Sequence, residues 1–166
     1  MKGIIIYNGK YGATEQYATW LAEALKLLKI KTEIAASDII AQYDVVIMGS
    51  SIYVGRLVID QWLKQHSKLL SKKKLFLFVV SGSTSNDKLL QQAVLDKNLD
   101  PLLRDKVKVF FLPGRCINSR LSWTDRIVLK MGAWLEKDPQ KKQVMENGFD
   151  NMDKNALDLI IEAVGR

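Results

Sequence analysis

The loop Asn8-Gly9-Lys10-Tyr11-Gly12-Ala13-Thr14 contains residue types suited to binding an anion. It follows an apolar run at residues 4–7 and leads into a segment whose apolar residues recur at helical spacing. The N–H groups and the dipole at a helix N-terminus favour a negative charge. The two glycines let the backbone curl closely around such a group, Thr14 can cap the helix and donate its hydroxyl, and Lys10 can screen a doubly charged phosphate. The loop therefore predicts a phosphate site, and its alternative is a plain glycine turn.

Several other phosphate and nucleotide sites are excluded by what this region lacks. No G-x-x-x-x-G-K-[ST] run is present, and Gly9-x-x-Gly12 lacks the three-glycine spacing of a dinucleotide fingerprint. No acidic pair follows the first apolar run, so the phospho-acceptor pocket of a response regulator is not expected either.

Two further loops of small and hydroxyl residues follow apolar runs later in the chain. One is Gly49-Ser50-Ser51-Ile52-Tyr53-Val54-Gly55-Arg56, and the other is Ser81-Gly82-Ser83-Thr84-Ser85-Asn86. Tyr53 is the only aromatic in the first of them, and the second has none. The alternative interpretation is that both are ordinary turns. Three such loops at the ends of neighbouring strands favour a shared ligand site.

Apolar strands alternating with amphipathic helices predict the elements that position these loops. We expect strands at residues 4–7, 31–35, 45–48, 75–80 and 107–112, and helices near 14–28, 58–70, 88–95 and 154–164. Continuous apolar strands between helices indicate a parallel sheet covered on both faces. The chain of 166 residues is therefore expected to form one α/β domain, a three-layer, doubly wound, five-stranded parallel sheet.

About 40 residues separate the fifth predicted strand from the last helix, which is long for a connection in a compact domain. We expect an inserted helical segment at about residues 114–150. Within it, one helix face would carry Trp123, Ile127, Lys130, Met131 and Trp134. That face either packs on the domain or forms an exposed patch for a membrane or an apolar substrate.

The formal net charge of +7 is concentrated in two stretches. Residues 64–74 hold five lysines and no acid, and residues 115–145 hold seven bases against three acids. Such a surface attracts anionic lipid or an acidic partner or is simply solvated, and we do not expect nucleic acid. The single Cys116 and the single His66 exclude an internal disulfide and a zinc or iron cluster. No apolar run spans a bilayer and no cleavage-type site follows Met1-Lys2, so a cytoplasmic location is expected, with peripheral contact at the inner face of the cell membrane as an option.

The run from Ile5 to Thr14, continued by Ala18 and Leu21, resembles the signature of the flavodoxin family. Gly9 departs from it, because the family usually has Ser or Thr there. The resemblance implies a sheet of order 2-1-3-4-5 that binds flavin mononucleotide (FMN) non-covalently. The first loop would hold the phosphate, and the other two would wrap the flavin ring, with Tyr53 stacked on it. The implied FMN-binding residues are Asn8, Gly9, Lys10, Tyr11, Gly12, Ala13, Thr14, Ser50, Ser51, Ile52, Tyr53, Val54, Gly55, Ser81, Gly82 and Ser83.

Two further consequences follow from this resemblance. Without a hydroxyl at position 9, FMN would bind more weakly by about 1.5 to 3 kcal/mol, the worth of one charge-assisted hydrogen bond. Electron-carrier flavodoxins commonly shield the ring with an aromatic in the loop after the fourth strand. Because residues 81–86 contain no aromatic, one flavin face is expected to be open to a substrate.

The basic charge and the insertion are similar to those of menaquinone-dependent protoporphyrinogen dehydrogenases, small flavodoxin-like enzymes. The run Trp123-Thr124-Asp125-Arg126-Ile127-Val128-Leu129-Lys130 resembles a stretch in that group. This resemblance implies electron transfer from a porphyrinogen or a similar reduced substrate to a quinone at the membrane. Arg115, Arg120 and Arg126 would then meet substrate carboxylates or lipid headgroups, and no catalytic residue is identified. Two alternatives remain, a soluble electron-transfer flavodoxin serving a redox partner protein, and a flavin-free binding module.

Overall fold

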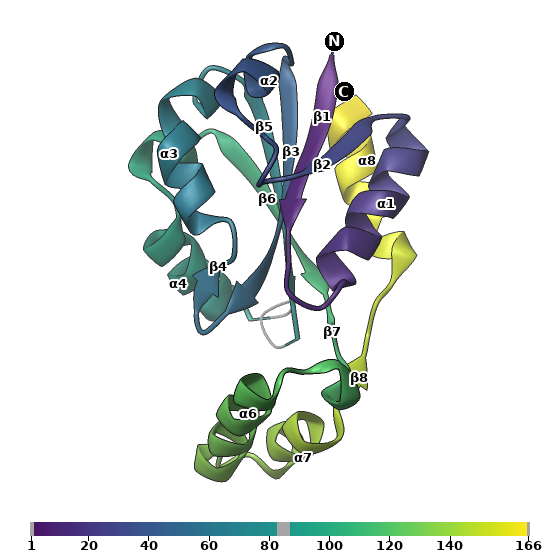
Figure 1. Ribbon diagram of the computed structural model, residues 1–166, viewed down its shortest axis with the longest axis vertical. Helices are drawn as coiled ribbons and strands as arrows, with labels where there is room; N and C mark the ends of the chain where they lie inside the picture. Colours follow the sequence, from purple (N-terminus) through teal and green to yellow (C-terminus); the bar gives the residue numbers. More distant parts are fainter. Residues whose placement is uncertain (1, 83–86, 166) are drawn as a thin grey trace.

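A mostly parallel sheet lies at the centre of the protein, with helices on both of its faces (Figure 1). The computed structural model describes residues 2–82 and 87–165. The main path of the sheet has the order β2-β1-β3-β5-β6, and β4 pairs antiparallel with β3. Counted as the five predicted strands, this is the order 2-1-3-4-5, so the predicted fold class is confirmed. The strands of this sheet are β1 Gly3–Asn8, β2 Leu28–Lys31, β3 Val45–Tyr53, β4 Arg56–Leu57, β5 Lys74–Ser81 and β6 Val107–Pro113.

Alternating side chains of the strands build two core layers. Ile4 and Ile6 pack toward the side of α3, whereas Ile5 between them packs toward α1 and α8. This alternation is the period of two that places successive strand side chains on opposite faces. The helices are α1 Ala13–Leu25, α2 Ser37–Ala41, α3 Asp60–Leu70, α4 Lys88–Asn98, α5 Pro101–Arg104, α6 Trp123–Leu135, α7 Pro139–Asn147 and α8 Asp158–Gly165, with short 3-10 turns η1 Asn118–Arg120 and η2 Lys154–Leu157.

The predicted position of the second strand, residues 31–35, is wrong. Helix α1 ends at Leu25, and Lys26 adopts the left-handed conformation with φ 53°, so the chain turns at once into β2. Residues 32–35 instead form turns, with the N–H of Ala35 donating to the carbonyl of Thr32 at 3.2 Å. Leu28 continues the apolar spacing of α1 but lies on the edge strand, where the apolar pattern is weak because none of the four residues is buried. Smaller shifts affect two predicted helices, since α3 begins at Asp60 and the first four residues of the last predicted helix form η2. The predicted loop at residues 49–56 is also mostly strand, because β3 continues to Tyr53 and turns back there into β4.

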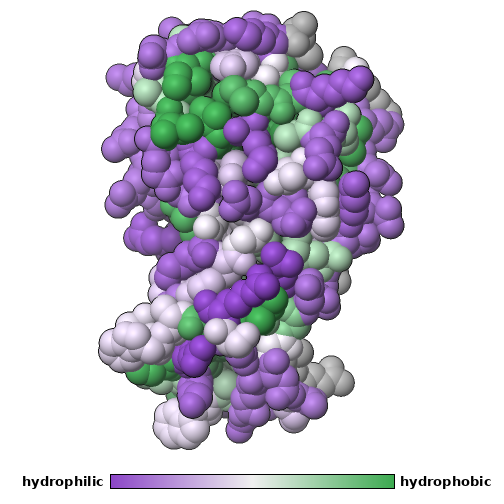
Figure 2. Space-filling view, turned by 45° about the vertical axis from the view of Figure 1, so that its right-hand side comes forward, coloured by the Kyte–Doolittle hydropathy of each residue, from purple (hydrophilic) through white to green (hydrophobic). Residues whose placement is uncertain are grey.

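The segment after β6 forms a lobe, which we define as residues 115–150. It begins with β7 Arg115–Cys116 and ends with β8 Phe149–Asp150, and these two short strands pair antiparallel. Between them, α6 packs on α7 beyond the carboxyl ends of the sheet strands (Figure 1). Figure 2 shows the lobe at the lower end of the molecule, set off from the body by a narrower waist. Among the described residues, no helix has the length and apolar character to cross a bilayer.

Both ends of the lobe are fastened at one place. The hydroxyl of the fully buried Tyr17 donates to the carbonyl of Pro113 at 2.7 Å and accepts the N–H of Asp153 at 3.0 Å. Next to it, the N–H of Gly114 donates to Ser81, and the carbonyl of Gly114 accepts the N–H of Asn151. The chain therefore leaves the body and returns to it beside the end of β5.

Candidate functional site

A pocket of about 730 Å³ lies at the carboxyl ends of the sheet strands, between the body and the lobe. This is the position at which open α/β sheets bind ligands, and the volume is in the range of cofactor sites. Predicted site residues that line the pocket are Lys10, Tyr11, Ala13, Thr14, Ser51, Ile52, Tyr53, Val54, Ser81 and Gly82. The structure thus brings residues of all three predicted loops to one cavity.

Other predicted residues lie beside the pocket and do not line it: Asn8, Gly9, Gly12, Ser50 and Gly55. The side chain of Asn8 accepts the N–H of Gly9 at 2.8 Å and donates to Thr32 at 2.9 Å, so it shapes the loop. Ser50 is fully buried and donates its hydroxyl to the backbone of Ser51. The predicted Ser83 lies outside the described residues. As ligand contacts, all of these assignments stay predictions.

At one end of the pocket, the start of α1 offers donors without partners. Thr14 is 1% exposed, and its hydroxyl has no hydrogen-bond partner. Thr14 does not cap the helix as predicted, because α1 begins at Ala13 and the N-cap is Gly12, at φ 84° and without a side-chain cap. The first N–H groups of a helix have no intrahelical acceptor. A buried orphan hydroxyl beside such amides fits a phosphate oxygen.

The structure gives Gly9 a different role from the one the sequence suggests. A Cβ atom on Gly9 would lie 2.4 Å from the Thr14 hydroxyl oxygen and 2.7 Å from the Thr14 Cβ. The β-branched side chain of Thr14 therefore fills the space that a serine at position 9 would need. Glycine at position 9, where the family signature has Ser or Thr, thus lets the loop pass close to the Thr14 side chain.

A second cluster in the pocket joins the lobe to the body. Asp125 of α6 is 6% exposed. Its carboxylate accepts a hydrogen bond from Tyr11, one from the Tyr53 hydroxyl at 2.6 Å, and one from the Lys10 ammonium at 3.0 Å. The hydrogen bonds from Tyr11, Tyr53 and Lys10 hold the pKa of Asp125 well below its ordinary range. The carboxylate is therefore charged at neutral pH and fastens the lobe to two of the predicted loops.

Lys10 has a place in this cluster that the sequence did not reveal. Its ammonium nitrogen lies 3.4 Å from the centre of the Tyr53 ring as well as 3.0 Å from Asp125. A cation over an aromatic face is attracted by the ring quadrupole. Lys10 therefore stands beside the ring predicted to stack on the flavin, and its predicted role at the phosphate stays a prediction.

The third loop receives its aromatic from the lobe. A Cβ on Gly82 would meet the Phe149 ring at 2.2 Å, so the ring of this β8 residue lies directly on the Gly82 backbone. Phe149 also lines the pocket. Phe149 thus brings an aromatic ring to a loop that has none of its own, and an open flavin face stays a prediction. No local sequence signal pointed to it, because the residue lies far along the chain.

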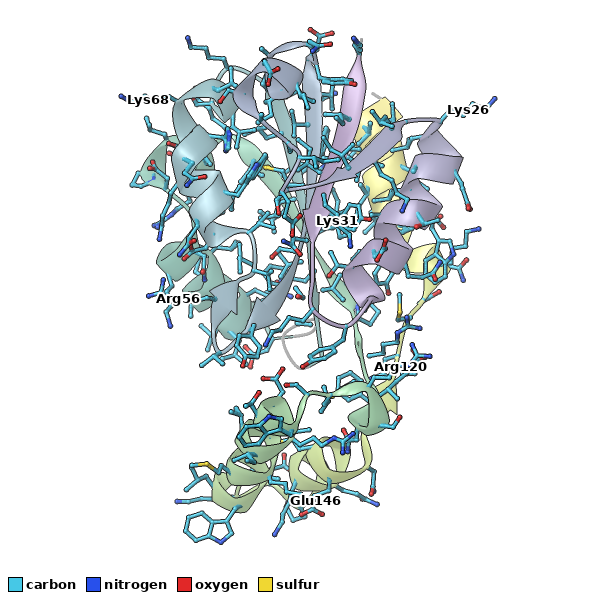
Figure 3. The ribbon with its side chains drawn as sticks, viewed as in Figure 1. Lys26, Lys31, Arg56, Lys68, Arg120 and Glu146 are labelled. Carbon is cyan, nitrogen blue, oxygen red and sulfur yellow. The ribbon has the colours of Figure 1, made fainter. Side chains whose placement is uncertain are left out.

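The three arginines that were predicted to share one role, binding substrate carboxylates or lipid headgroups, lie in different surroundings. Arg115 lines the pocket, and its Nη2 atom lies 3.6 Å from the position of a Cβ on Gly12. Arg126 donates to the carbonyls of Asn118 and Ser119 at 3.1 Å, so it stabilises η1. Arg120 is exposed at the junction of lobe and body (Figure 3). Only Arg115 is in position to meet a ligand in this pocket.

Helix α6 presents apolar side chains both to the pocket and to solvent. The lobe residues that form an apolar wall of the pocket are Leu121, Val128, Leu129, Met145 and Phe149. Trp123 and Trp134 are 74% and 80% exposed, so the alternative in which this helix face packs on the domain is wrong for both tryptophans. Figure 2 shows pale and green side chains between hydrophilic ones on the lobe. The sequence-based alternative of an exposed apolar face is the one the structure has.

Both the sequence and the architecture are similar to those of known proteins. A family model described as flavodoxin domain matches residues 4–143. Oxidised Flavodoxin 2 from Bacillus cereus is similar over all of both chains, with TM-score 0.56 and 14% identity. Two-electron reduced Megasphaera elsdenii flavodoxin has TM-score 0.51 and 19% identity, covering 87% of this chain and 96% of its own.

Oxidised Flavodoxin 1 from Bacillus cereus has TM-score 0.52 and 17% identity, covering 69% of this chain and 85% of its own. These identities establish likeness of fold alone. No curated protein matches the chain. Because the family model covers most of the sequence, the chain belongs to the flavodoxin domain family, whose cofactor is FMN, and the predictions of that family and cofactor are confirmed.

Proposed function

We propose that this protein is an FMN-dependent oxidoreductase whose redox partner is an apolar organic molecule that enters between the body and the lobe. The observation that carries the proposal is the composition of the pocket. One end has the unpartnered hydroxyl of Thr14 beside the N-terminus of α1, and the lobe contributes an apolar wall. A polar phosphate cradle and an apolar wall in one cavity suit a flavin nucleotide together with an apolar substrate.

The residues of the three loops divide the binding task. The FMN phosphate would lie at Thr14 and the N-terminus of α1, and the ring would extend toward Tyr53 and the loop at Ser81 and Gly82. Bound FMN supplies the redox chemistry, accepting electrons from a reduced organic substrate and passing them to an acceptor. The protein contributes orientation and the exclusion of water. Asp125 holds the Tyr53 hydroxyl, and Phe149 covers the backbone at Gly82.

The narrower assignment that we propose is quinone-linked oxidation of protoporphyrinogen or of a similar reduced substrate. The run at residues 123–130, which resembles that enzyme group, forms most of α6 and supplies both Asp125 and part of the apolar wall. The exposed Trp123 and Trp134 are the residue type that favours the bilayer interface. Bases on the same lobe would favour anionic headgroups, so a peripheral contact with the membrane would bring a lipid-soluble quinone to the pocket.

The test begins with an absorption spectrum of the purified protein and identification of the released flavin. Anaerobic mixing with protoporphyrinogen should then reduce the bound flavin, and a menaquinone analogue should reoxidise it. A preparation that stays colourless after incubation with FMN, with an unchanged melting temperature, would refute flavin binding, since a bound ligand must stabilise the native state.

A plain electron carrier is the second candidate, because the similar solved structures include flavodoxins. The lysines of residues 64–74, among them the exposed Lys68 labelled in Figure 3, would then meet an acidic partner protein. Fast reduction by a flavodoxin reductase, combined with no reaction with quinones, would decide for the carrier.

A further inference from the structure

The phosphate end of the pocket holds a second unpartnered donor group besides Thr14. Arg115 opens the lobe at β7, and its Nε atom is buried without a hydrogen-bond partner. Among the described residues, Arg115 makes no ion pair, although Asp150 lies directly opposite it in the β7–β8 pair. Burying a guanidinium N–H without an acceptor is costly, so this arrangement points to a ligand that supplies one.

The position of Arg115 indicates which group of the ligand would accept its hydrogen bond. Its Nη2 atom lies 3.6 Å from the Cβ position of Gly12, the N-cap of α1, and both Arg115 and Thr14 line the same pocket. A guanidinium group presents a planar fork of donors that matches the oxygens of a phosphate. An anion bound at the first turn of α1 would therefore lie within reach of Arg115.

Two charged residues close to this point in the sequence, Glu15 and Lys10, have partners elsewhere. Glu15, the one acid in the first turn of α1, accepts the Tyr7 hydroxyl at 2.9 Å and lies 4.0 Å from the Lys29 ammonium. Lys10, the cation of the loop itself, is bound to Asp125. In the pocket beside the first turn of α1, Arg115 is thus the cation without an ion-pair partner among the described residues, and the one carboxylate of that turn is paired elsewhere.

We propose that Arg115 binds the phosphate of FMN together with Thr14 and the N-terminus of α1. It replaces the side-chain bond that Gly9 cannot make, and it makes the protein selective for phosphorylated flavin over riboflavin. The inference rests on the proposed flavin site. It also gives the lobe a part in holding the cofactor, since the phosphate would be bound by the first residue of the lobe.

The experiment titrates FMN and riboflavin into the flavin-free protein and follows quenching of flavin fluorescence. Arg115→Gln should raise the dissociation constant for FMN by about 10- to 140-fold, the equivalent of one charge-assisted hydrogen bond, and leave that for riboflavin within about 3-fold. Arg115→Lys should fall between wild type and Arg115→Gln, because it keeps the charge and loses the fork. Arg120→Gln is the matched control, since it removes the same charge from an exposed position nearby.

The outcomes distinguish flavin binding by the protein from phosphate binding by Arg115. Wild-type protein that binds neither flavin would refute the proposed function and this inference with it. Wild-type protein that binds FMN, with Arg115→Gln and Arg120→Gln equally strong or equally weakened, would refute the inference alone. Equal loss of FMN and riboflavin in Arg115→Gln would also refute it, because the pocket as a whole would then have changed. Melting curves of the flavin-free variants show whether the fold is kept.

Discussion

Replacing Asp125 tests how the lobe is held over the pocket. Its side chain is 7% exposed and accepts hydrogen bonds from Lys10 and Tyr11 of the loop after β1 and from Tyr53 at the end of β3. Asp125→Asn keeps the size of the side chain, removes the charge and turns one acceptor oxygen into a donor amide. The variant therefore weakens these contacts without leaving a cavity.

The magnitude follows from the partners of the carboxylate. Each hydrogen bond to a charged group is worth about 1.5 to 3 kcal/mol, and the amide oxygen of Asn keeps one acceptor. The Lys10 side chain is 40% exposed, so its ion pair adds no more than about 1 kcal/mol. We expect Asp125→Asn to lower the free energy that holds the lobe by about 2 to 3 kcal/mol, which raises the open population roughly 30- to 140-fold.

Limited tryptic digestion with mass spectrometry measures this population, because cleavage of a transiently opened segment tracks its equilibrium when reclosing is fast. Cleavage within residues 115–150 should accelerate by about 30- to 140-fold in Asp125→Asn. Asp60→Asn is the matched control: the Asp60 side chain is also 7% exposed and pairs with Arg56 and Lys64, at 3.0 and 3.2 Å, outside the pocket. The reasoning is refuted if the lobe is cleaved at the wild-type rate in Asp125→Asn, or equally fast in Asp60→Asn.

Three more expectations concern the loop, the pH and the surface of the lobe. Gly9→Ser should destabilise the protein by about 1 to 3 kcal/mol in urea unfolding, because its Cβ would overlap Thr14, whereas Gly165→Ser, with no atom within 4 Å, should not. Because the pKa of Asp125 is lower in the folded than in the unfolded protein, its charge stabilises the fold fully above the unfolded pKa of about 4, and this stabilisation is lost as the pH falls below that value. Protection of the lobe amides, measured by hydrogen exchange relative to intrinsic rates, should therefore be constant from pH 5 to 8 and decline in stronger acid. Protection that does not change with pH would contradict this. Replacing both tryptophans of α6 by serine should reduce co-sedimentation with anionic vesicles, and wild-type binding should weaken as salt shortens the Debye length from about 10 to 3 Å; equal sedimentation of variant and wild type would rule out α6 as the contact.

The parts of the site carried by continuous chain could be predicted from the sequence. Each of the three loops follows an apolar strand, and parallel strands end at the same edge of a sheet, so residues as distant as Thr14, Tyr53 and Gly82 were expected to share a pocket. The alternation of apolar strands and helices gave the fold class for the same reason. The edge strand β2 was misplaced because an edge strand needs little apolar pattern.

The contacts that the lobe makes could not be predicted in the same way. The hydrogen bond between Tyr11 and Asp125 joins residues 114 positions apart, and Phe149 reaches Gly82 from the far end of the lobe. Spacing along the chain gives no register for such pairs, because the lobe does not continue the strand-helix alternation. The resemblance of residues 123–130 to an enzyme group drew attention to this segment, but the partners of Asp125 are seen only in the structure.

The fastening of the lobe at Tyr17 has a consequence for how this protein can vary. Since the chain leaves at Pro113 and returns by Asp153 to the same hydroxyl, the main sheet and both core layers are built almost entirely outside this segment, with Met152 as the one described residue of it that packs on the core layers. Insertions are tolerated where the two ends of the inserted segment lie close together. We therefore expect that residues 116–150 can be shortened or exchanged as one segment, so a chain of this architecture can acquire a new partner while Arg115 and the first turn of α1 stay unchanged.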